Sequence, residues 1–195
     1  SYPQFILASA TIANPEELAS TLIQDEVALI HKNGAPTSEK EMVFYNPPAL
    51  TPDGSVRAPV IDTAAKIASR FIAADVQTIV FAKSRVSVEL LVQYLRGSYK
   101  ERMEKDRIQG YRGGYLPKER RAIERGLREG KIVGVATTNA LELGIDIGNL
   151  ECAVLAGYPG TIASTWQQAG RAGRRSGGAV SILVGGAGPL DQFIV

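Results

Sequence analysis

The sequence predicts an α/β fold, in which a mainly parallel central sheet is flanked by helices. Short apolar runs rich in β-branched residues alternate along the chain with longer stretches of helical period, and this alternation is typical of parallel βαβ units. The chain has 195 residues, of which 45% are hydrophobic, so it can bury one sizeable core. We therefore expect one main domain.

A strand and a helix are expected before that domain. Phe5 to Ala10 has the composition of a strand, and Pro15 to Ile23 has the pattern of a helix with Asn14 as its N-cap. Proline at the first helical position favours this start of the helix. Residues 32–59 are rich in Pro, Gly and Thr, which indicates a linker or a crossing between domains.

The main domain is expected to begin near Glu41. Its strands are predicted at Glu41–Tyr45, Thr78–Ala82, Ile108–Tyr111, Val133–Ala136, Cys152–Ala156 and Ala179–Val184. Its helical segments are predicted at Val60–Ala74, from Val86 toward Glu104, and at Lys118–Glu129, Ala140–Leu143, Ile162–Ala169 and from Gly188 onward. Right-handed crossovers would bring the C-terminal ends of the strands to one edge of the sheet, where ligands bind in such folds.

Composition excludes several classes of protein. The formal net charge is only +2, so any basic surface for nucleic acid must be local. A single cysteine excludes an internal disulfide framework and a Cys-rich zinc cluster, and no metal site is predicted. No apolar run approaches the roughly 20 residues of a membrane span. We expect a cytoplasmic protein without a membrane partner, and the apolar ends of the chain suggest a piece of a longer one.

The most specific segment is Gln167-Gln168-Ala169-Gly170-Arg171-Ala172-Gly173-Arg174-Arg175. Its glycines permit tight turns, and two of its arginines stand three residues apart. Guanidinium groups so placed can bind a phosphate and offset the charge that develops during phosphoryl transfer. An isolated Gly-Arg pair is usually a basic surface turn, but the full Q-x-x-G-R-x-G-R arrangement favours a functional interpretation.

This arrangement resembles motif VI of the superfamily 2 helicases, the DEAD/DEAH-box group. Ser9–Thr11, Thr78–Arg85 and Ala136–Ile147 resemble motifs III, IV and V of that family, in the same order. Motif V and the segment Tyr111–Arg121 are most similar to the mitomycin-repair-factor helicases, a bacterial DNA-repair subgroup. The resemblance implies a RecA-like three-layer domain over residues 41–195, preceded in residues 1–40 by the tail of a first RecA-like domain and a linker.

The resemblance also implies roles for individual residues. Arg171 and Arg174 would act as arginine fingers toward the γ-phosphate of ATP. Nucleotide contacts would come from Gly144, Asp146 and Gln167. Contacts to single-stranded nucleic acid, with DNA favoured, would come from Ser84, Arg85, Arg112, Gly113, Arg120 and Thr138. Ser9 and Thr11 would couple hydrolysis to strand movement.

Two positions depart from the family pattern. Gln168 stands where DEAD-box proteins usually have an arginine, and Pro117 stands where many relatives have the glutamine of a Q-x-x-R motif, so only Arg120 of that pair is carried over. The sequence also lacks a G-x-x-x-x-G-K-[ST] loop and a D-E-x-H box. ATP and Mg²⁺ would therefore be held mainly by the first RecA-like domain, and we expect this chain alone to be inactive.

Other interpretations remain open. A non-catalytic nucleic-acid-binding or interaction module would use the Arg-Gly segments only to hold phosphate. A Rossmann-type enzyme would need a glycine-rich loop after the first strand, where this sequence has Ser9-Ala10-Thr11. Among single residues, Trp166 is expected to anchor the core rather than stack on a base, Cys152 to be buried, and Gly185–Pro189 to form a turn.

Overall fold

The computed structural model describes residues 3–9, 12–31, 39–98, 106–142, 145, 147–148, 150–173 and 178–195. The chain divides into two compact units, Ser1–Pro36 and Thr37–Val195. Each unit is described by itself below.

The first unit contains the predicted helix α1 (Pro15–Ile23), with proline in its first turn. Asn14 does not cap this helix with its side chain; instead its Nδ2 donates to Oε2 of Glu17 at 2.8 Å. The strand expected over Phe5 to Ala10 is wrong for residues 3–9, which form no strand. Phe5 and Ile6 are 60% and 86% exposed, and a strand without a neighbour has no partner for its backbone hydrogen bonds.

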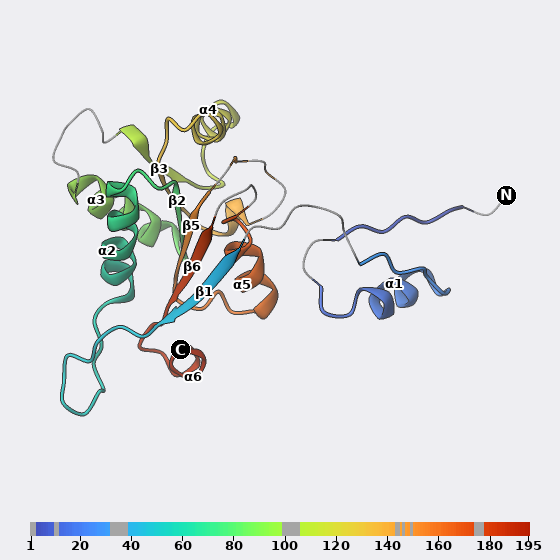
Figure 1. Cartoon of the computed structure of the whole chain (residues 1–195), viewed down its shortest axis with the longest axis horizontal. Coiled ribbons are helices and arrows are strands. Elements are labelled where there is room, and N and C mark those ends of the chain that lie inside the picture. The colour runs from blue at the N-terminus through green and yellow to red at the C-terminus, as the bar shows by residue number, and fades with distance from the viewer. Residues whose placement is uncertain are drawn as a thin grey trace. The chain divides into compact units, whose positions relative to one another are not determined.

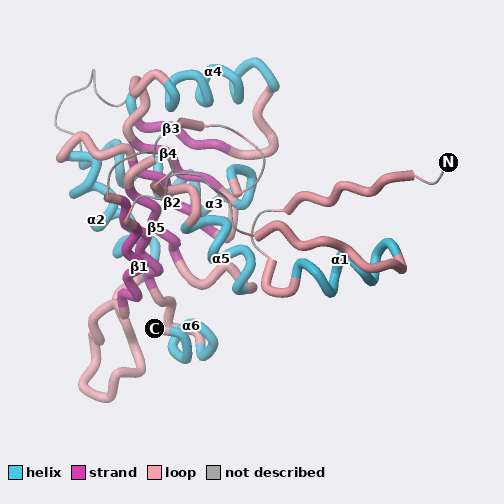
Figure 2. Tube along the Cα trace, turned by 45° about the vertical axis from the view of Figure 1, so that its right-hand side comes forward, coloured by secondary structure: helices cyan, strands magenta, loops and turns pink. Residues whose placement is uncertain are grey.

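The second unit is built on one six-stranded sheet (Figures 1 and 2). The strands are β1 (Lys40–Tyr45), β2 (Thr78–Ala82), β3 (Ile108–Tyr111), β4 (Gly134–Thr137), β5 (Cys152–Ala156) and β6 (Ala179–Val184). Their order is β1-β6-β5-β2-β4-β3, and every pair is parallel. The predicted α/β class is confirmed, and all six strand predictions lie within one residue of the observed bounds.

Helices follow the strands and cover both faces of this sheet. They are α2 (Val60–Ala73), α3 (Arg85–Ser98), α4 (Pro117–Arg128), the 3₁₀ turn η2 (Asn139–Leu141), α5 (Ile162–Ala169) and α6 (Pro189–Ile194). Helix α3 is described as far as Ser98, and its expected continuation toward Glu104 falls on residues 99–105, which lie outside the described part of the chain. Within the described residues, no helix is long and apolar enough to cross a membrane.

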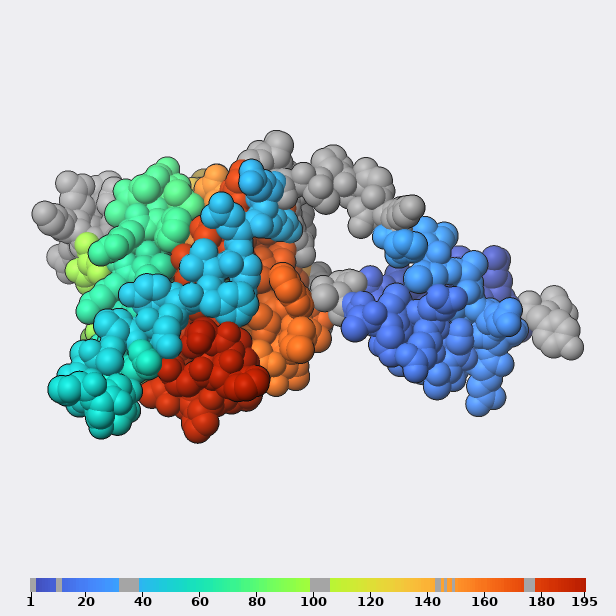
Figure 3. Space-filling model, turned by 60° about the horizontal axis from the view of Figure 1, so that its bottom comes forward, coloured from blue at the N-terminus to red at the C-terminus, as the bar shows by residue number. Residues whose placement is uncertain are grey.

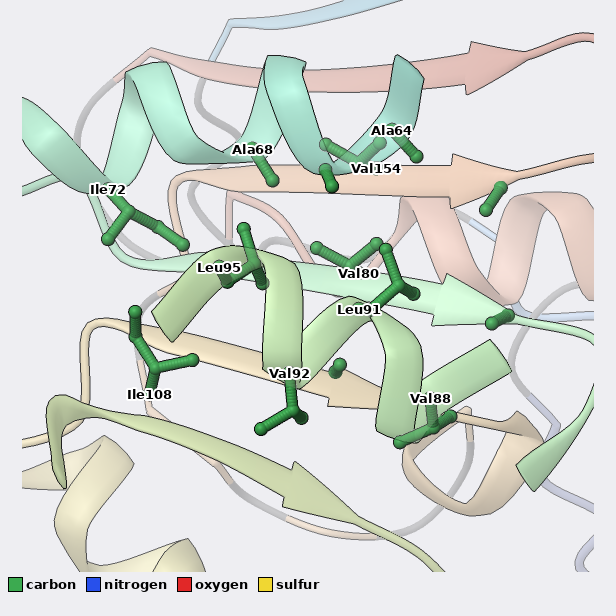
Figure 4. Close-up of a cluster of buried hydrophobic side chains, with 14 of the residues drawn as sticks. Ala64, Ala68, Ile72, Val80, Val88, Leu91, Val92, Leu95, Ile108 and Val154 are labelled. Carbon is green, nitrogen blue, oxygen red and sulfur yellow. The ribbon is translucent and has the colours of Figure 1, made fainter. Parts of the chain in front are cut away.

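One face of the sheet is covered by α2 and α3 (Figure 4). In α2, Ala64, Ala68 and Ile72 recur at intervals of four residues and therefore lie on one side of the helix, against the strands. In α3, Leu91 and Leu95 are fully buried in the same cluster. This packing positions the start of α3, and with it the loop that leaves β2.

The opposite face is covered by α4 and by the segments around α5 and α6 (Figure 1). Ile123 and Leu127 of α4 pack against Val135 of β4, in the cluster that also receives Ile194 of α6. Helix α6 lies beside the chain leaving β1 (Figure 3), where Asn46 and Gln192 exchange hydrogen bonds of 3.1 and 3.2 Å. Because all six strands are parallel, their C-terminal ends lie at the same edge of the sheet.

Candidate functional site

Three adjacent strand ends carry residues that the motif resemblance assigned to nucleic acid. In the order β2-β4-β3, Ser84 follows β2, Thr138 follows β4 and Arg112 follows β3. These residues are far apart in sequence, and the parallel sheet brings them to one edge. The sheet topology therefore brings these three residues, which were predicted to contact nucleic acid, to the same edge.

At the end of β2, Ser84 begins helix α3. Its hydroxyl accepts the backbone N–H of Ser87 at 3.1 Å and lies 2.8 Å from the hydroxyl of Ser87. This is the geometry of a helix N-cap, so Ser84 has a structural role whatever it binds. Arg85, the first residue of α3, is exposed at this edge.

At the end of β3, Arg112 is held by neighbours on two elements. Its Nη2 lies 3.4 Å from Oε1 of Glu89, and its guanidinium carbon lies 5.1 Å from the centroid of the Tyr115 ring. Gly113 is exposed, and a Cβ added there would meet no atom within 4 Å. The packing of the chain itself thus does not require glycine at position 113.

Helix α4 brings Arg120 close to the same edge. Pro117, where many relatives have glutamine, is the first residue of this helix, a position that suits proline. The N–H of Leu116, just before it, donates to Oε2 of Glu119 at 2.9 Å. Within the described residues, the buried Nε atoms of Arg112 and Arg120 have no hydrogen-bond partner. A buried donor without an acceptor is costly, so a movement of either side chain that brings its Nε to an acceptor, such as a phosphate oxygen, would be favourable.

Tyr111 and Glu124 lie beneath these arginines. The Tyr111 hydroxyl donates to Oε1 of Glu124 at 2.8 Å. Burial, and then the hydrogen bond to the Glu124 carboxylate, raise the pKa of Tyr111 to about 12. The phenol therefore remains a neutral hydrogen-bond donor at physiological pH.

A cavity of about 330 Å³ opens at the ends of β2, β4 and β5. The polar residues in its wall come from the end of β2, the segment after β4, and helix α5: Lys83, Thr138, Asn139, Glu142, Ser164 and Gln168. The cavity thus lies where the segments resembling motifs IV, V and VI meet.

Arg171 connects the motif VI segment to the motif V segment. Its Nε and Nη2 donate to the carbonyl oxygen of Glu142 at 3.0 and 2.6 Å, and its Nη1 donates to the carbonyl oxygen of Ile145 at 2.8 Å. Arg171 is only 3% exposed. In this structure its guanidinium therefore faces the backbone of the motif V segment.

Gln168 makes a second connection between the same two segments. Its Nε2 donates to Oε2 of Glu142 at 3.0 Å, and both side chains are buried. The residue that departs from the DEAD-box pattern thus satisfies a buried carboxylate within its own domain, where a charged group needs such a partner. Sequence reasoning missed Glu142, because its position directly after η2 does not indicate which side chain it meets.

The remaining predicted residues are placed only in part. Gln167 lies half-buried on α5, and Ser9 is exposed in the first unit. Gly144, Asp146, Arg174 and Thr11 lie outside the described residues.

Trp166 corrects an expectation. It is 51% exposed and does not anchor the core. Helix α5 buries Thr165, Gln168 and Ala169, and Trp166, which follows the first of these, faces solvent. Two of those three buried residues are polar, and the apolar pattern therefore gave the wrong face of the helix. Cys152, by contrast, is buried as predicted, and burial raises the pKa of its thiol to about 12.

The glycine-rich segment after β6 forms a turn, as predicted. The N–H of Gly186 donates to Oδ2 of Asp191 at 2.7 Å. A carboxylate of the chain itself thus takes the place that an anion would have in a phosphate loop. Asp191 was missed by sequence reasoning, because its other partners, Tyr158 and Lys83, follow β5 and β2 and are distant in sequence.

Comparison with known proteins identifies the relatives of this chain. The profile of the helicase conserved C-terminal domain matches residues 63–176. The uncharacterized ATP-dependent helicase YprA of Bacillus subtilis is 52% identical over the whole chain, and the ATP-dependent helicase HRQ1 of Saccharomyces cerevisiae is 40% identical over 98% of it. The chain spans 26% and 18% of the lengths of these two proteins.

Solved structures agree with this assignment. The DUF1998 helicase MrfA bound to DNA is 52% identical, superposes with a TM-score of 0.93, and is matched over 100% of this chain and 26% of its own. MrfA bound to DNA and AMPPNP superposes with a TM-score of 0.91, covering 100% of this chain and 27% of its own. The resemblance to superfamily 2 helicases and the RecA-like fold are confirmed. The chain belongs to the helicase conserved C-terminal domain family.

Proposed function

We propose that this chain is the second RecA-like domain of an ATP-dependent helicase or translocase that acts on single-stranded nucleic acid, with DNA favoured. Residues 41–195 form that domain, and residues 1–40 are the tail of a first domain and a linker. The DNA-bound and AMPPNP-bound structures of a relative at 52% identity support DNA and ATP as ligands. The resemblance to the mitomycin-repair-factor subgroup supports a role in DNA repair.

One observation carries the proposal. Consecutive strand ends of one sheet present Ser84, Thr138 and Arg112, and the buried Nε atoms of Arg112 and Arg120 have no acceptor among the described residues. Phosphate oxygens of a strand crossing this edge would supply such acceptors. The open surroundings of Gly113 would also let a phosphate approach the backbone closely.

The residues of this chain fit a supporting role toward ATP rather than the main binding site. No phosphate-loop motif occurs in the sequence, and the glycine-rich turn after β6 already holds the Asp191 carboxylate. ATP and Mg²⁺ would therefore be held mainly by a first RecA-like domain. When bound there, ATP would supply the phosphoryl transfer that drives the motor.

The contribution of this chain to that reaction would come from Arg171 and Arg174. Their guanidinium groups would offset the negative charge that builds up on the γ-phosphate. Arg171 would have to leave the carbonyl groups of Glu142 and Ile145 to reach a nucleotide, so its engagement would also release the motif V segment. This exchange would link the nucleotide to the segment that carries Thr138.

The experiment that tests the proposal is equilibrium binding of the chain to a fluorescent single-stranded DNA over a range of salt concentrations. Each phosphate contact changes the slope of log K against log salt by roughly −0.7, so about three contacts predict a slope near −2. The variant with Arg112→Gln and Arg120→Gln should lose most of this slope, whereas Arg70→Gln, on the exposed side of α2, should leave it unchanged. Binding that does not depend on salt would refute the proposed interface.

A further inference from the structure

Asp191 joins the ends of three strands. Its Oδ2 accepts the N–H of Tyr158, after β5, at 3.1 Å and the N–H of Gly186, after β6, at 2.7 Å. Its Oδ1 lies 3.6 Å from Nζ of Lys83, which follows β2. The Asp191 side chain is 9% exposed and that of Lys83 is 59% exposed, so a buried carboxylate holds an accessible ammonium.

The neighbouring glycines leave room for this arrangement. Gly157, at the end of β5, has a φ of +90°, and a Cβ there would lie 3.2 Å from both Oδ2 of Asp191 and Cε of Lys83. A Cβ at Gly186 would lie 2.8 Å from the same carboxylate oxygen. Side chains at these two positions would displace the carboxylate, so the local backbone is built around the Lys83–Asp191 pair.

The fold itself needs Lys83 little. Asp191 already accepts two backbone N–H groups, and an ion pair with an exposed lysine at 3.6 Å contributes little to stability. The ammonium has three donors, and it stands at a cavity whose wall also presents the hydroxyl groups of Thr138 and Ser164. The wall includes the Glu142 carboxylate as well, one oxygen of which accepts a hydrogen bond from Gln168. A cation beside hydroxyl groups at a strand edge is suited to bind a phosphate group.

We propose that Lys83 is a further phosphate-binding residue of the strand interface and that Asp191 is its positioning residue. This inference rests on the proposed function. The phosphate is assigned to the nucleic-acid backbone rather than to a nucleotide. Lys83 directly precedes Ser84 and Arg85, and it follows β2, the neighbour of the strand β4 that Thr138 follows.

The first test compares Lys83→Gln with Lys131→Gln in the chain. Lys131 is a matched control, because it also pairs with a carboxylate, Glu129, at 2.7 Å but precedes β4 at the opposite edge of the sheet. Lys83→Gln should weaken binding of a fluorescent single-stranded DNA about tenfold and reduce the salt slope by about 0.7. Lys131→Gln should change neither quantity.

The second test separates positioning from general stability. Asp191→Asn should weaken strand binding in the wild-type background but have no further effect on a chain that already carries Lys83→Gln. Equal effects in both backgrounds would show that Asp191 acts only through the fold, and would overturn its positioning role.

Further outcomes distinguish this inference from the proposed function. Salt-dependent binding by the wild type that Lys83→Gln leaves unchanged would overturn the assignment of Lys83 and leave the proposed function intact. In a protein that joins this chain to a nucleotide-holding domain, Lys83→Gln that binds the DNA normally but loses affinity for ADP would place the phosphate on a nucleotide instead. Absence of salt-dependent binding by the wild type would refute the proposed function itself.

Discussion

Arg171 donates two hydrogen bonds to a single backbone atom, the carbonyl oxygen of Glu142, at 3.0 and 2.6 Å. A third bond from the same guanidinium reaches the carbonyl oxygen of Ile145. This arginine belongs to the most specific motif of the sequence, and it also connects two segments of the fold through buried hydrogen bonds. Replacement of Arg171 should therefore change two measurable properties, the stability of the chain and the catalytic rate.

Arg171→Ala should destabilise the chain by about 3 kcal/mol, because at least two buried carbonyl groups lose their donors. For a domain of this size the loss corresponds to a melting temperature lower by about 6 to 12 °C. Arg85→Ala is the control, because Arg85 is exposed and its replacement should change stability by less than about 0.5 kcal/mol. Equal melting temperatures for Arg171→Ala and wild type would show that these hydrogen bonds do not hold in solution.

Arg174→Ala should reduce strand-stimulated kcat by at least about a hundredfold, in a protein that joins this chain to a nucleotide-holding domain. Arg171→Ala should reduce kcat by a similar factor, and the affinity for ATP should fall much less in both variants. Lysine should not restore activity at either position, since it lacks the planar guanidinium. Arg175→Ala should change kcat only a few-fold, and equal losses in all three variants would indicate a merely basic patch.

Gly113→Ala should weaken single-stranded DNA binding by at least about fivefold without lowering the melting temperature, because the added methyl group meets only open space within the chain. The matched control is Gly97→Ala on α3, where an added Cβ also meets no atom within 4 Å. The two variants are compared by thermal melting and by DNA titration. Unchanged DNA affinity in Gly113→Ala would remove this backbone from the proposed interface.

Tyr111 should make stability depend on pH at the alkaline end. Its pKa rises from an ordinary value of 10 to about 12 in the folded chain, so the unfolded chain releases the proton first. The contribution of Tyr111 to the free energy of unfolding, about 2 to 3 kcal/mol, is therefore fully present below pH 10 and is lost as the pH rises toward 12. Tyr111→Phe should lack this loss, and urea unfolding of both proteins at several alkaline pH values measures the difference. Parallel curves for the two proteins would contradict the burial of a neutral phenol.

The sequence by itself determined the alternation of strands and helices in the second unit. Thr78–Ala82 and Cys152–Ala156 were predicted with their observed bounds, because five consecutive apolar or β-branched residues between polar segments suit a central parallel strand. The arrangement Q-x-x-G-R-x-G-R likewise indicated a phosphate-related function from the sequence alone. Such features depend only on residues that are close together in sequence, so the sequence is sufficient to predict them.

Tertiary structure alone decided which partners these residues meet. Residues 5–9 have strand composition but form no strand in the described part of the chain. Trp166 is exposed because α5 buries polar neighbours instead. The contacts of Arg171 with Glu142 and of Asp191 with Lys83 join segments separated by 29 and 108 positions. Hydrogen bonds and ion pairs depend on distances of a few ångströms, and only the folded sheet, with its strands out of sequence order, brings these groups within that range.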